Sequence, residues 1–266
     1  MIEQLTSAKN PRVLAWRSLK DRKGRLAHQA FLVEGDRMVA EALGSGFPLQ
    51  ALLLRADRFK EISSISAQNE EASRIRLELL PPELPVYVLP DHVFASLSDT
   101  KTPQGTAAVV SLQPQAPAGS RLIALDGVQD PGNVGTILRT ADAAGLDGVI
   151  LSPDCADVFA PKVLRATMGS IFRVGLLFPA DLAAQLSLLR QQGYAILSSQ
   201  LDGEPFYDRQ GVGKKWALVV GNEGNGVSPA VQSVATHRLR LPMRGGAESL
   251  NAAVAAGIMM YELMKT

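Results

Sequence analysis

The second half of the chain alternates between short apolar segments and amphipathic segments. Continuous apolar runs predict buried strands, and apolar residues recurring every three or four positions predict helices. We expect strands at 122–126, 148–152, 172–178, 194–199, 216–221 and 237–243, and helices at 136–144, 160–169, 181–192 and 249–265. In the last helix Leu250, Val254, Ile258 and Tyr261 recur along one face. Strand–helix alternation with apolar strands predicts a parallel sheet covered by helices on both faces.

The first part of the chain mixes helical and strand signals. The pattern predicts a helical basic stretch within 9–25, a short strand entering a helix over 31–43, strands at 49–55, 86–90 and 106–110, and a polar helix at 66–78. The segment SLQPQAPAGS (111–120) has two prolines, a glycine and no charge, which is typical of a linker. We therefore predict an α/β protein with a first domain at 1–112, a linker at 113–120 and a second domain at 121–266.

Composition excludes several classes of protein. Hydrophobic residues make up 46% of the 266 residues and charged residues 20%, as in soluble globular proteins. No apolar run approaches the roughly 20 residues of a membrane span, and the amino terminus lacks the apolar core of a signal peptide, so we expect a cytoplasmic protein. Cys155 is the single cysteine, which excludes an internal disulfide, and the three histidines show no metal-ligand spacing. No metal site is expected, and an incidental cysteine is favoured over a nucleophile.

The net charge of +1 is close to neutral, but basic residues are concentrated near the amino terminus. Between Lys9 and Arg25 they are Lys9, Arg12, Arg17, Lys20, Arg22, Lys23 and Arg25, against the single acid Asp21. Such a segment is typical of a phosphate-binding arm, because cations near a polyphosphate release condensed counterions. A solvated helix face is the alternative, and the segment by itself does not decide between them.

Three loops of the second domain are unusual, and each follows a predicted strand. Ligands of parallel sheets bind at the carboxyl ends of the strands, so these loops are the candidate site. In 125–145 we expect Asn133 to cap a helix, with Arg139 six residues further and not far from the same side. In 219–229 closely spaced glycines allow the backbone to wrap a ligand, although neither a dinucleotide fingerprint nor a Walker loop is present. In 241–258 we expect Ser249 as a helix cap and Asn251 in the first turn.

Taken singly, each loop also fits an ordinary structural role: a loop–helix junction, a hairpin, or a capped helix packed closely through its alanines. Together they resemble the three motifs of the SpoU (TrmH-like) branch of the SPOUT RNA methyltransferases. The matching residues are Asn133 and Arg139 in the first motif, Gly221 to Gly226 in the second, and Pro242 to Gly245 with Glu248 to Asn251 in the third. The stretch LRATMGSIFRV (164–174) also resembles the family. Thr136 and Ala252-Ala253 depart from it without touching the polar positions.

The resemblance implies a fold and an activity. It implies a deep trefoil knot in the second domain, a homodimer packed through the knotted region, and an L30e-like substrate-binding domain in front. It further implies S-adenosylmethionine as cofactor and 2′-O-ribose methylation of RNA. The implied polar site consists of Asn133, Arg139, Glu223, Ser249 and Asn251. The implied cofactor-binding residues are Gly221, Asn222, Gly226, Leu241, Met243 and Leu250.

Several alternatives stay open at this point. Arg139 is often assigned as the base in this family, but a guanidinium keeps its proton above about pH 12, which favours phosphate binding and oxyanion stabilisation. The front domain favours ribosomal RNA over transfer RNA without identifying the nucleotide or a role in antibiotic resistance. A non-catalytic RNA-binding or ribosome-assembly protein is a rival. A Rossmann-type oxidoreductase is excluded by the missing early glycine fingerprint.

Overall fold

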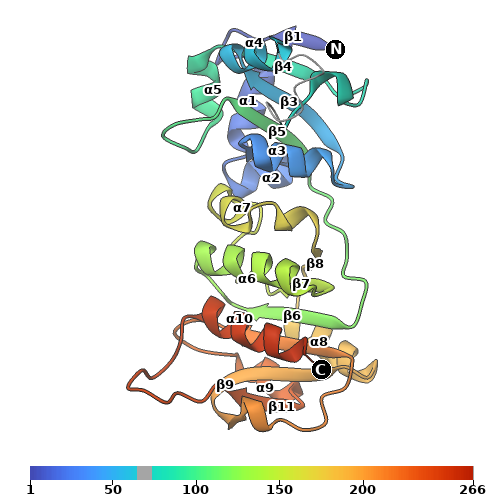
Figure 1. The fold of residues 1–266 in the computed structure, drawn as a ribbon, viewed down its shortest axis with the longest axis vertical. Coiled ribbons are helices and arrows are strands. Elements are labelled where there is room, and N and C mark those ends of the chain that lie inside the picture. The colour runs from blue at the N-terminus through green and yellow to red at the C-terminus, as the bar shows by residue number, and fades with distance from the viewer. Residues whose placement is uncertain (65–73, 266) are drawn as a thin grey trace. The chain divides into compact units, whose positions relative to one another are not determined.

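The computed structural model describes residues 1–64 and 74–265, which are traced along the chain in Figure 1. Two compact units emerge from the contacts. The first is Met1–Gln113 together with Phe159–Phe172, and the second is Pro114–Val158 together with Arg173–Thr266. The helix predicted at 66–78 lies largely outside the described residues, and its end contains only the short 3₁₀ turn η1 (Leu77–Leu79).

The first unit is built on a mixed five-stranded sheet. Its strands are β1 (Ile2–Gln4), β2 (Ala30–Glu34), β3 (Leu49–Arg55), β4 (Val86–Leu89) and β5 (Thr106–Ser111), in the order β1-β4-β3-β5-β2. Strand β4 pairs in parallel with β1 and β3, whereas β5 is antiparallel to β2 and β3. Its helices are α1 (Pro11–Ser18), α2 (Arg22–His28), α3 (Asp36–Leu43), α4 (Ala56–Ser64), α5 (Asp91–Leu97) and α7 (Pro161–Thr167). The predicted strands are confirmed, and β1 is an addition.

Aromatic packing explains why a segment from the second half of the sequence belongs to the first unit. Phe31 of β2 lies 4.8 Å from Phe159 between ring centroids, and Phe47 lies 5.4 Å from Phe172. Phe172 sits in the 3₁₀ turn η2 (Ser170–Phe172) and is buried. The strand predicted at 172–178 therefore starts later than expected, as β8 (Gly175–Leu177). Burying these rings together is worth more than extending a strand by three residues.

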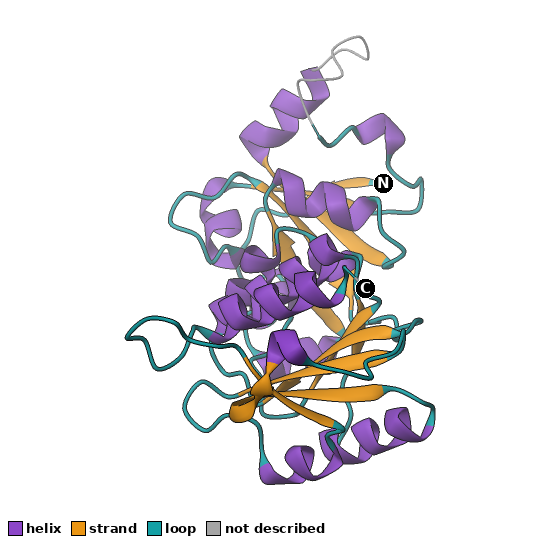
Figure 2. Ribbon diagram, turned by 60° about the horizontal axis from the view of Figure 1, so that its bottom comes forward, coloured by secondary structure: helices purple, strands orange, loops and turns teal. Residues whose placement is uncertain are grey.

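The second unit is built on a six-stranded sheet in which every pairing is parallel, as predicted. Besides β8, its strands are β6 (Arg121–Asp126), β7 (Gly148–Leu151), β9 (Ala195–Pro205), β10 (Trp216–Gly221) and β11 (His237–Arg240), in the order β11-β9-β10-β6-β7-β8. Its helices are α6 (Pro131–Ala144), α8 (Leu182–Gln191), α9 (Pro229–Val234) and α10 (Ala252–Leu263), with a 3₁₀ turn η3 (Phe206–Asp208). Figure 2 shows helices on both sides of these strands.

The central strands β6 and β10 carry the core of this unit. Their continuous apolar runs are buried on both faces, which explains why a strand-period alternation is missing from the sequence. The segment predicted as a linker lies against this sheet, because the Gln115 carbonyl accepts a hydrogen bond from the Leu176 amide at 2.7 Å. Pro117 lies so close to Gly148 that a Cβ there would come within 2.5 Å of it.

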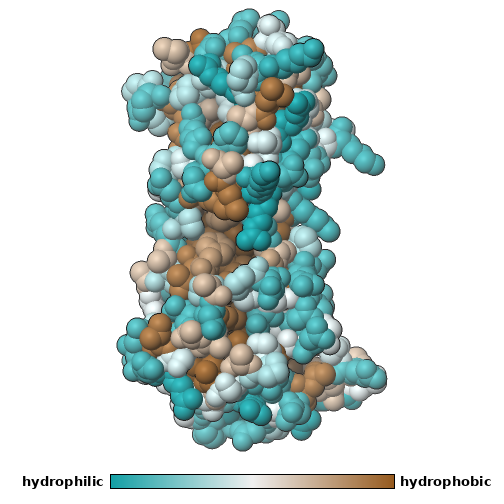
Figure 3. All heavy atoms as spheres, turned by 180° about the vertical axis from the view of Figure 1, so that it is seen from behind, coloured by the Kyte–Doolittle hydropathy of each residue, from teal (hydrophilic) through white to brown (hydrophobic). Residues whose placement is uncertain are grey.

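Helix α10 is apolar nearly all round. One face is buried in the unit through Ala253, Ala256, Met259, Met260 and Leu263. The face noted in the sequence, which carries Leu250, Val254, Ile258 and Tyr261, is exposed, with Val254 and Tyr261 about half accessible at 50% and 51%. Figure 3 shows the side of the molecule opposite to that in Figure 1, where hydrophilic side chains predominate and apolar side chains reach the surface in smaller areas. Within the described residues, no helix is long and apolar enough to cross a membrane.

Candidate active site

The site begins where two neighbouring strands end at the same level. In the parallel pair of β6 and β10, Asp126 is in register with Gly221, so the loops that follow leave one edge of the sheet side by side. The Asn222 side chain donates from Nδ2 to the Gly127 carbonyl at 2.9 Å. The Ser228 amide donates to Asp126 Oδ2 at 2.6 Å. These two bonds fasten the start and the end of the second loop to the first.

The loop after β10 is a tight backbone loop organised by Asn222. Its Oδ1 accepts hydrogen bonds from the amides of Gly224 and Asn225, and its backbone pairs with Gly226 in both directions. Two of the glycines are required for different reasons. A Cβ on Gly221 would lie 2.2 Å from the Gly226 backbone, and Gly226 itself has a φ of +67°, which disfavours other residues.

Helix α6 starts differently from the prediction. Its N-cap is Asp130, whose side chain accepts a hydrogen bond from the Asn133 amide at 2.8 Å. The expectation that Asn133 caps the helix is therefore wrong. Because the carboxylate three residues earlier satisfies this amide, the side chain of Asn133 is available for contacts outside the helix.

Asn133 uses both ends of its side-chain amide to connect the other two loops. Its Nδ2 donates to Glu223 Oε1 at 2.8 Å, and its Oδ1 accepts from Asn251 Nδ2 at 2.9 Å. These contacts span 90 and 118 residues of sequence. The three segments singled out in the sequence therefore meet at one place, in the order Glu223, Asn133, Asn251.

Helix α10 also has an unexpected cap. Asn251 is its N-cap and accepts hydrogen bonds at Oδ1 from the amides of Ala253 and Val254, at 2.9 and 3.2 Å. Ser249, the predicted cap, lies two residues earlier in the exposed loop. A single Asn251 side chain thus ends the loop, starts the helix and donates to Asn133.

A pocket of about 610 Å³ opens beside these contacts. The six residues predicted to bind the cofactor all line it: Gly221, Asn222, Gly226, Leu241, Met243 and Leu250. Of the predicted polar site, Glu223, Ser249 and Asn251 also line it, and Asn133 is bonded to two of these three. Several lining residues belong to no recognisable motif and could not be predicted from the sequence, among them Ser199, Gln200 and Gln232. The contribution of Asp130 was detectable, since an Asp just ahead of a helical segment is a capping signal.

Arg139 lies apart from the pocket lining. It is exposed on α6, and its guanidinium makes no ion pair or hydrogen bond within the described part of the chain. Six residues of α-helix correspond to 600° of rotation and a rise of about 9 Å, which puts Arg139 about 120° around the axis from Asn133. The two side chains therefore occupy different sides of α6, contrary to the prediction.

Comparison with known proteins identifies the family. The model of the SpoU rRNA Methylase family matches residues 120–261, and that of the MRM3-like substrate binding domain matches residues 10–108. The chain belongs to the SpoU rRNA methylase family. The predicted family and the predicted substrate-binding domain in front are thereby confirmed.

Relatives of similar length include both a sequence match and solved structures. The chain is 36% identical to the 23S rRNA (guanosine(2553)-2′-O)-methyltransferase RlmP of Bacillus subtilis, across 98% of this chain and 99% of that protein. It superposes on an AdoMet-bound rRNA methyltransferase from Sinorhizobium meliloti with a TM-score of 0.82 at 29% identity, covering 99% and 98% of the two chains. It also superposes on the SpoU methyltransferase AviRb of Streptomyces viridochromogenes in complex with AdoMet, with a TM-score of 0.83 at 26% identity, covering 97% and 98%.

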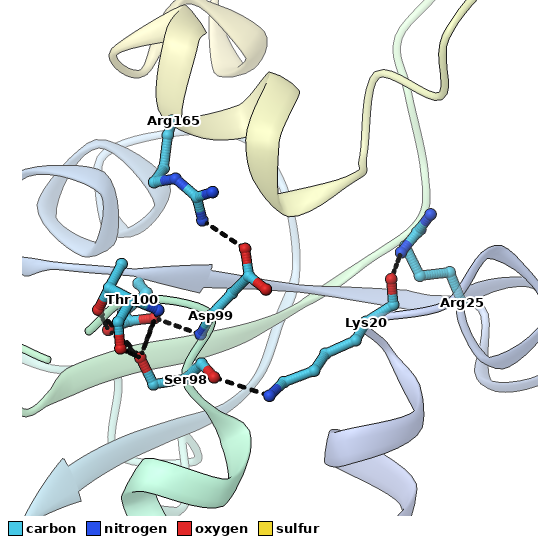
Figure 4. A network of polar contacts seen from close by, with 7 residues as sticks. Lys20, Arg25, Ser98, Asp99, Thr100 and Arg165 are labelled. Carbon is cyan, nitrogen blue, oxygen red and sulfur yellow. Dashed lines mark hydrogen bonds and ion pairs between the residues drawn. The ribbon is translucent and has the colours of Figure 1, made fainter. Parts of the chain in front are cut away.

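The basic residues between Lys9 and Arg25 of this SpoU family chain fall into two groups. The charged groups of some contact other parts of the protein, whereas those of the others are exposed to solvent. Lys20 donates from Nζ to the Ser98 carbonyl and buried Arg25 donates to the Lys20 carbonyl, as Figure 4 shows. Lys20 also donates to the Ser96 carbonyl, and Arg25 to the Leu19 carbonyl. Arg12 forms an ion pair with Glu3 and lies over the ring of Tyr87. The remaining four cations are exposed and have no ion pair among the described residues: Lys9, Arg17, Arg22 and Lys23.

Cys155 has no features of a reactive nucleophile. Burial raises the pKa of its thiol, which outweighs the hydrogen bonds that lower it. Its Sγ lies 3.3 Å from the Leu125 carbonyl, as expected for a protonated thiol donor. Stabilising the neutral form disfavours the thiolate that would be needed for nucleophilic attack. No metal-binding group of His, Cys, Asp and Glu side chains occurs in the described ranges.

The two roles of Asn251 are separable by substitution. Asn251→Ala removes the helix cap and the donor to Asn133, and we expect the free energy of unfolding to fall by about 1 kcal/mol. Asn251→Ser keeps a capping oxygen but is too short to reach Asn133, so its loss should be a few tenths of a kcal/mol. Urea denaturation of both variants measures the difference. Equal losses would show that the cap contributes little and that the Asn133 contact dominates.

Proposed function

We propose that this protein transfers a methyl group from S-adenosylmethionine to the 2′-hydroxyl of a ribose in ribosomal RNA. The observation that carries the proposal is the convergence of Glu223, Asn133 and Asn251 at the rim of a pocket lined by the second and third family motifs. Membership of the SpoU rRNA methylase family supports the chemistry and the class of RNA. The relative RlmP, named for 23S rRNA and 2′-O-methylation, supports the same assignment.

The residues of the pocket fit a nucleoside cofactor. Its volume of about 610 Å³ lies within the roughly 300–1,000 Å³ usual for small-molecule and cofactor sites. Apolar side chains of Leu241, Met243 and Leu250 form one part of the wall and suit an adenine ring. The glycine loop offers backbone polar groups at close range, because Gly221 and Gly226 carry no side chain. Two structurally similar methyltransferases contain S-adenosylmethionine (AdoMet) in their solved structures, which supports the same cofactor here.

The cofactor supplies an electrophilic methyl group on a sulfonium, so the protein has to orient the ribose hydroxyl and stabilise the charge left when its proton departs. Glu223 presents a carboxylate at the rim, held in place by the Asn133 amide. Asn251 fixes Asn133 from the other side, so the carboxylate is oriented by two successive hydrogen bonds. Ser249 adds a hydroxyl at the same rim.

For Arg139 we propose the role of a cation that binds the RNA phosphate and stabilises the developing oxyanion. Its exposure and its lack of a protein partner among the described residues leave the guanidinium available for an external anion. A role as general base is disfavoured because guanidinium stays protonated at physiological pH. The proton then departs to the phosphate or to water.

Arg139→Ala should lower kcat for methyl transfer to ribosomal RNA by about 100-fold or more, as removal of one oxyanion-stabilising donor does elsewhere. Because Arg139 does not line the pocket, the affinity for S-adenosylmethionine should stay within about twofold of wild type. Methyl incorporation and calorimetry measure the two quantities. A large loss of cofactor affinity with little change in kcat would assign Arg139 to the wrong site.

We further propose that residues 1–112 recognise the RNA and that residues 121–266 form the catalytic domain, joined at 113–120. The match of residues 10–108 to a substrate-binding domain supports this division. Within the first domain, the exposed cations Lys9, Arg17, Arg22 and Lys23 are the candidates for phosphate contacts. Lys20 and Arg25 are removed from that role, since their charged groups already donate to backbone carbonyls.

The double variant Arg22→Gln/Lys23→Gln should weaken RNA binding and flatten its salt dependence, by about 0.7–0.9 in logarithmic slope for each phosphate that is no longer neutralised. The control is Arg37→Gln/Lys60→Gln, which removes the same charge from exposed positions on α3 and α4. Fluorescence anisotropy with ribosomal RNA fragments over a salt series measures both. Equal effects of the two pairs would mean that only net charge matters and that the basic segment is a solvated face.

We also propose a homodimer packed through the second unit and a trefoil knot in that unit, as the family resemblance implies, and the cytoplasmic location that the hydropathy pattern favours. The exposed apolar face of α10 at Val254, Ile258 and Tyr261 supports a dimer, because apolar stripes of this kind are usually covered. Val254→Asp should shift the protein towards monomer in sedimentation velocity. A wild-type protein that sediments as a monomer at micromolar concentration would contradict the dimer.

A further inference from the structure

The loop that follows β11 has two different sides. Leu241 and Met243 line the cofactor pocket, whereas the alternate residues Pro242 and Arg244 line a second hollow with Tyr207. The lining thus alternates along the loop, as successive side chains do in an extended segment. A wall one residue thick therefore separates the cofactor pocket from the second hollow.

The second hollow is open and offers an aromatic ring. Its volume is about 580 Å³, and Tyr207 is 53% exposed in the 3₁₀ turn η3. The ring is supported from behind by Phe206, which is fully buried and lies 5.6 Å away between centroids in an edge-to-face arrangement. Phe206 is in turn covered by the guanidinium of Arg209 at 4.3 Å. Tyr207 is thus an exposed ring on a well-packed base.

Cations without protein partners accompany this ring. Arg238, Arg240 and Arg244 are all exposed, and none of their guanidinium groups forms an ion pair or hydrogen bond within the described residues. The first two alternate with buried Leu239 on the edge strand β11, so they share one face of it. The nearby acids are Asp208, next to Tyr207, and Glu204 of β9, which is in register with Leu239, and the three arginines outnumber them.

We propose that the hollow between Tyr207 and Arg244 is a second RNA subsite, which holds an unpaired nucleotide flanking the one that is methylated. The base stacks on Tyr207, and the phosphate binds Arg244, with Arg240 and Arg238 continuing the path of the strand. Aromatic stacking and arginine contacts are the chemistry by which proteins hold single-stranded RNA. The position across a thin wall from the methyl donor fits a neighbour of the target ribose. This inference rests on the proposed function.

Arginines on an edge strand also have a simpler use, since charge at an edge prevents strand addition by another chain. That role explains Arg238 and Arg240, but it requires neither a supported aromatic ring nor a hollow beside it. A contact between two copies of the chain is another occupant of such a hollow. The experiment has to separate these outcomes from RNA binding.

Two labelled probes of equal length test the subsite: a short oligoadenylate, and the same ribose-phosphate chain without bases. Tyr207→Leu keeps an apolar side chain of similar bulk but loses the aromatic face. It should weaken oligoadenylate binding about tenfold, as loss of one base–aromatic stack does, and leave the abasic probe unaffected. Tyr207→Phe should restore wild-type affinity. Arg244→Gln should weaken binding of both probes, because it removes a phosphate-binding cation.

Control measurements distinguish a failure of the proposed RNA subsite from a failure of the proposed methyltransferase function. Arg190→Gln removes an exposed arginine from α8 that has no ion pair among the described residues, and it should leave binding of both probes unchanged. Cofactor affinity should be equal in all variants, and wild type should methylate ribosomal RNA. A methylating wild type whose Tyr207→Leu variant binds both probes normally would overturn the subsite alone. A changed sedimentation coefficient in that variant would overturn it in favour of a contact between copies.

Absence of methyl transfer in wild type would instead contradict the proposed function.

Discussion

The site depends on the side chain of Asn133, which joins two loops that the chain order keeps apart. Its amide donates to Glu223 and accepts from Asn251, and both contacts are close to ideal in length. The Asn133 side chain is available for these two contacts because Asp130, rather than Asn133, caps α6 and accepts the hydrogen bond from a backbone amide of its first turn. An aspartate at this position would lose the donor to Glu223 and bring two carboxylates together. The requirement for an amide, with one donor end and one acceptor end, therefore follows from the geometry.

These contacts organise the site more than they stabilise the fold. Each is worth about 1 kcal/mol or less in solvent-accessible surroundings, whereas the unit is held by the buried apolar strands β6 and β10. Their value is positional. The two strands end in register at Asp126 and Gly221, so the loops that follow start from one rigid edge. Short polar bonds then fix where the loops go, and the pocket forms between the glycine loop and the segment that leads into α10.

Periodicity predicted most of the architecture because the second unit obeys one simple pattern. Apolar strands alternating with helices require a parallel sheet, and the site follows at its carboxyl edge.

The residues that cap the helices were predicted less well. Asp130 and Asn251, rather than Asn133 and Ser249, cap α6 and α10. The Asp130 cap was detectable from the sequence, whereas Ser249 and Asn251 are both good caps and nothing local distinguishes them. The helix predicted at 160–169 is present as α7, but the strand predicted from 172 begins only at Gly175, because Phe159 and Phe172 pack against aromatic rings more than 100 residues away in sequence. Chemical roles could be inferred from the three motifs only in combination, and the positions of Tyr207 and Arg244 beside one hollow had no signal in the sequence.

The site requires the glycine loop and the segment before α10 to form one preorganised cofactor pocket. Calorimetric titration of S-adenosylmethionine into wild type and into Gly221→Ala tests it directly, with Gly213→Ala as control because a Cβ there meets no atom within 4 Å. A Cβ on Gly221 would lie 2.2 Å from the Gly226 backbone, so the loop has to move. At an overpacking cost of roughly 1–3 kcal/mol, cofactor affinity should fall by about tenfold or more. Equal affinity in Gly221→Ala, Gly213→Ala and wild type would contradict the account.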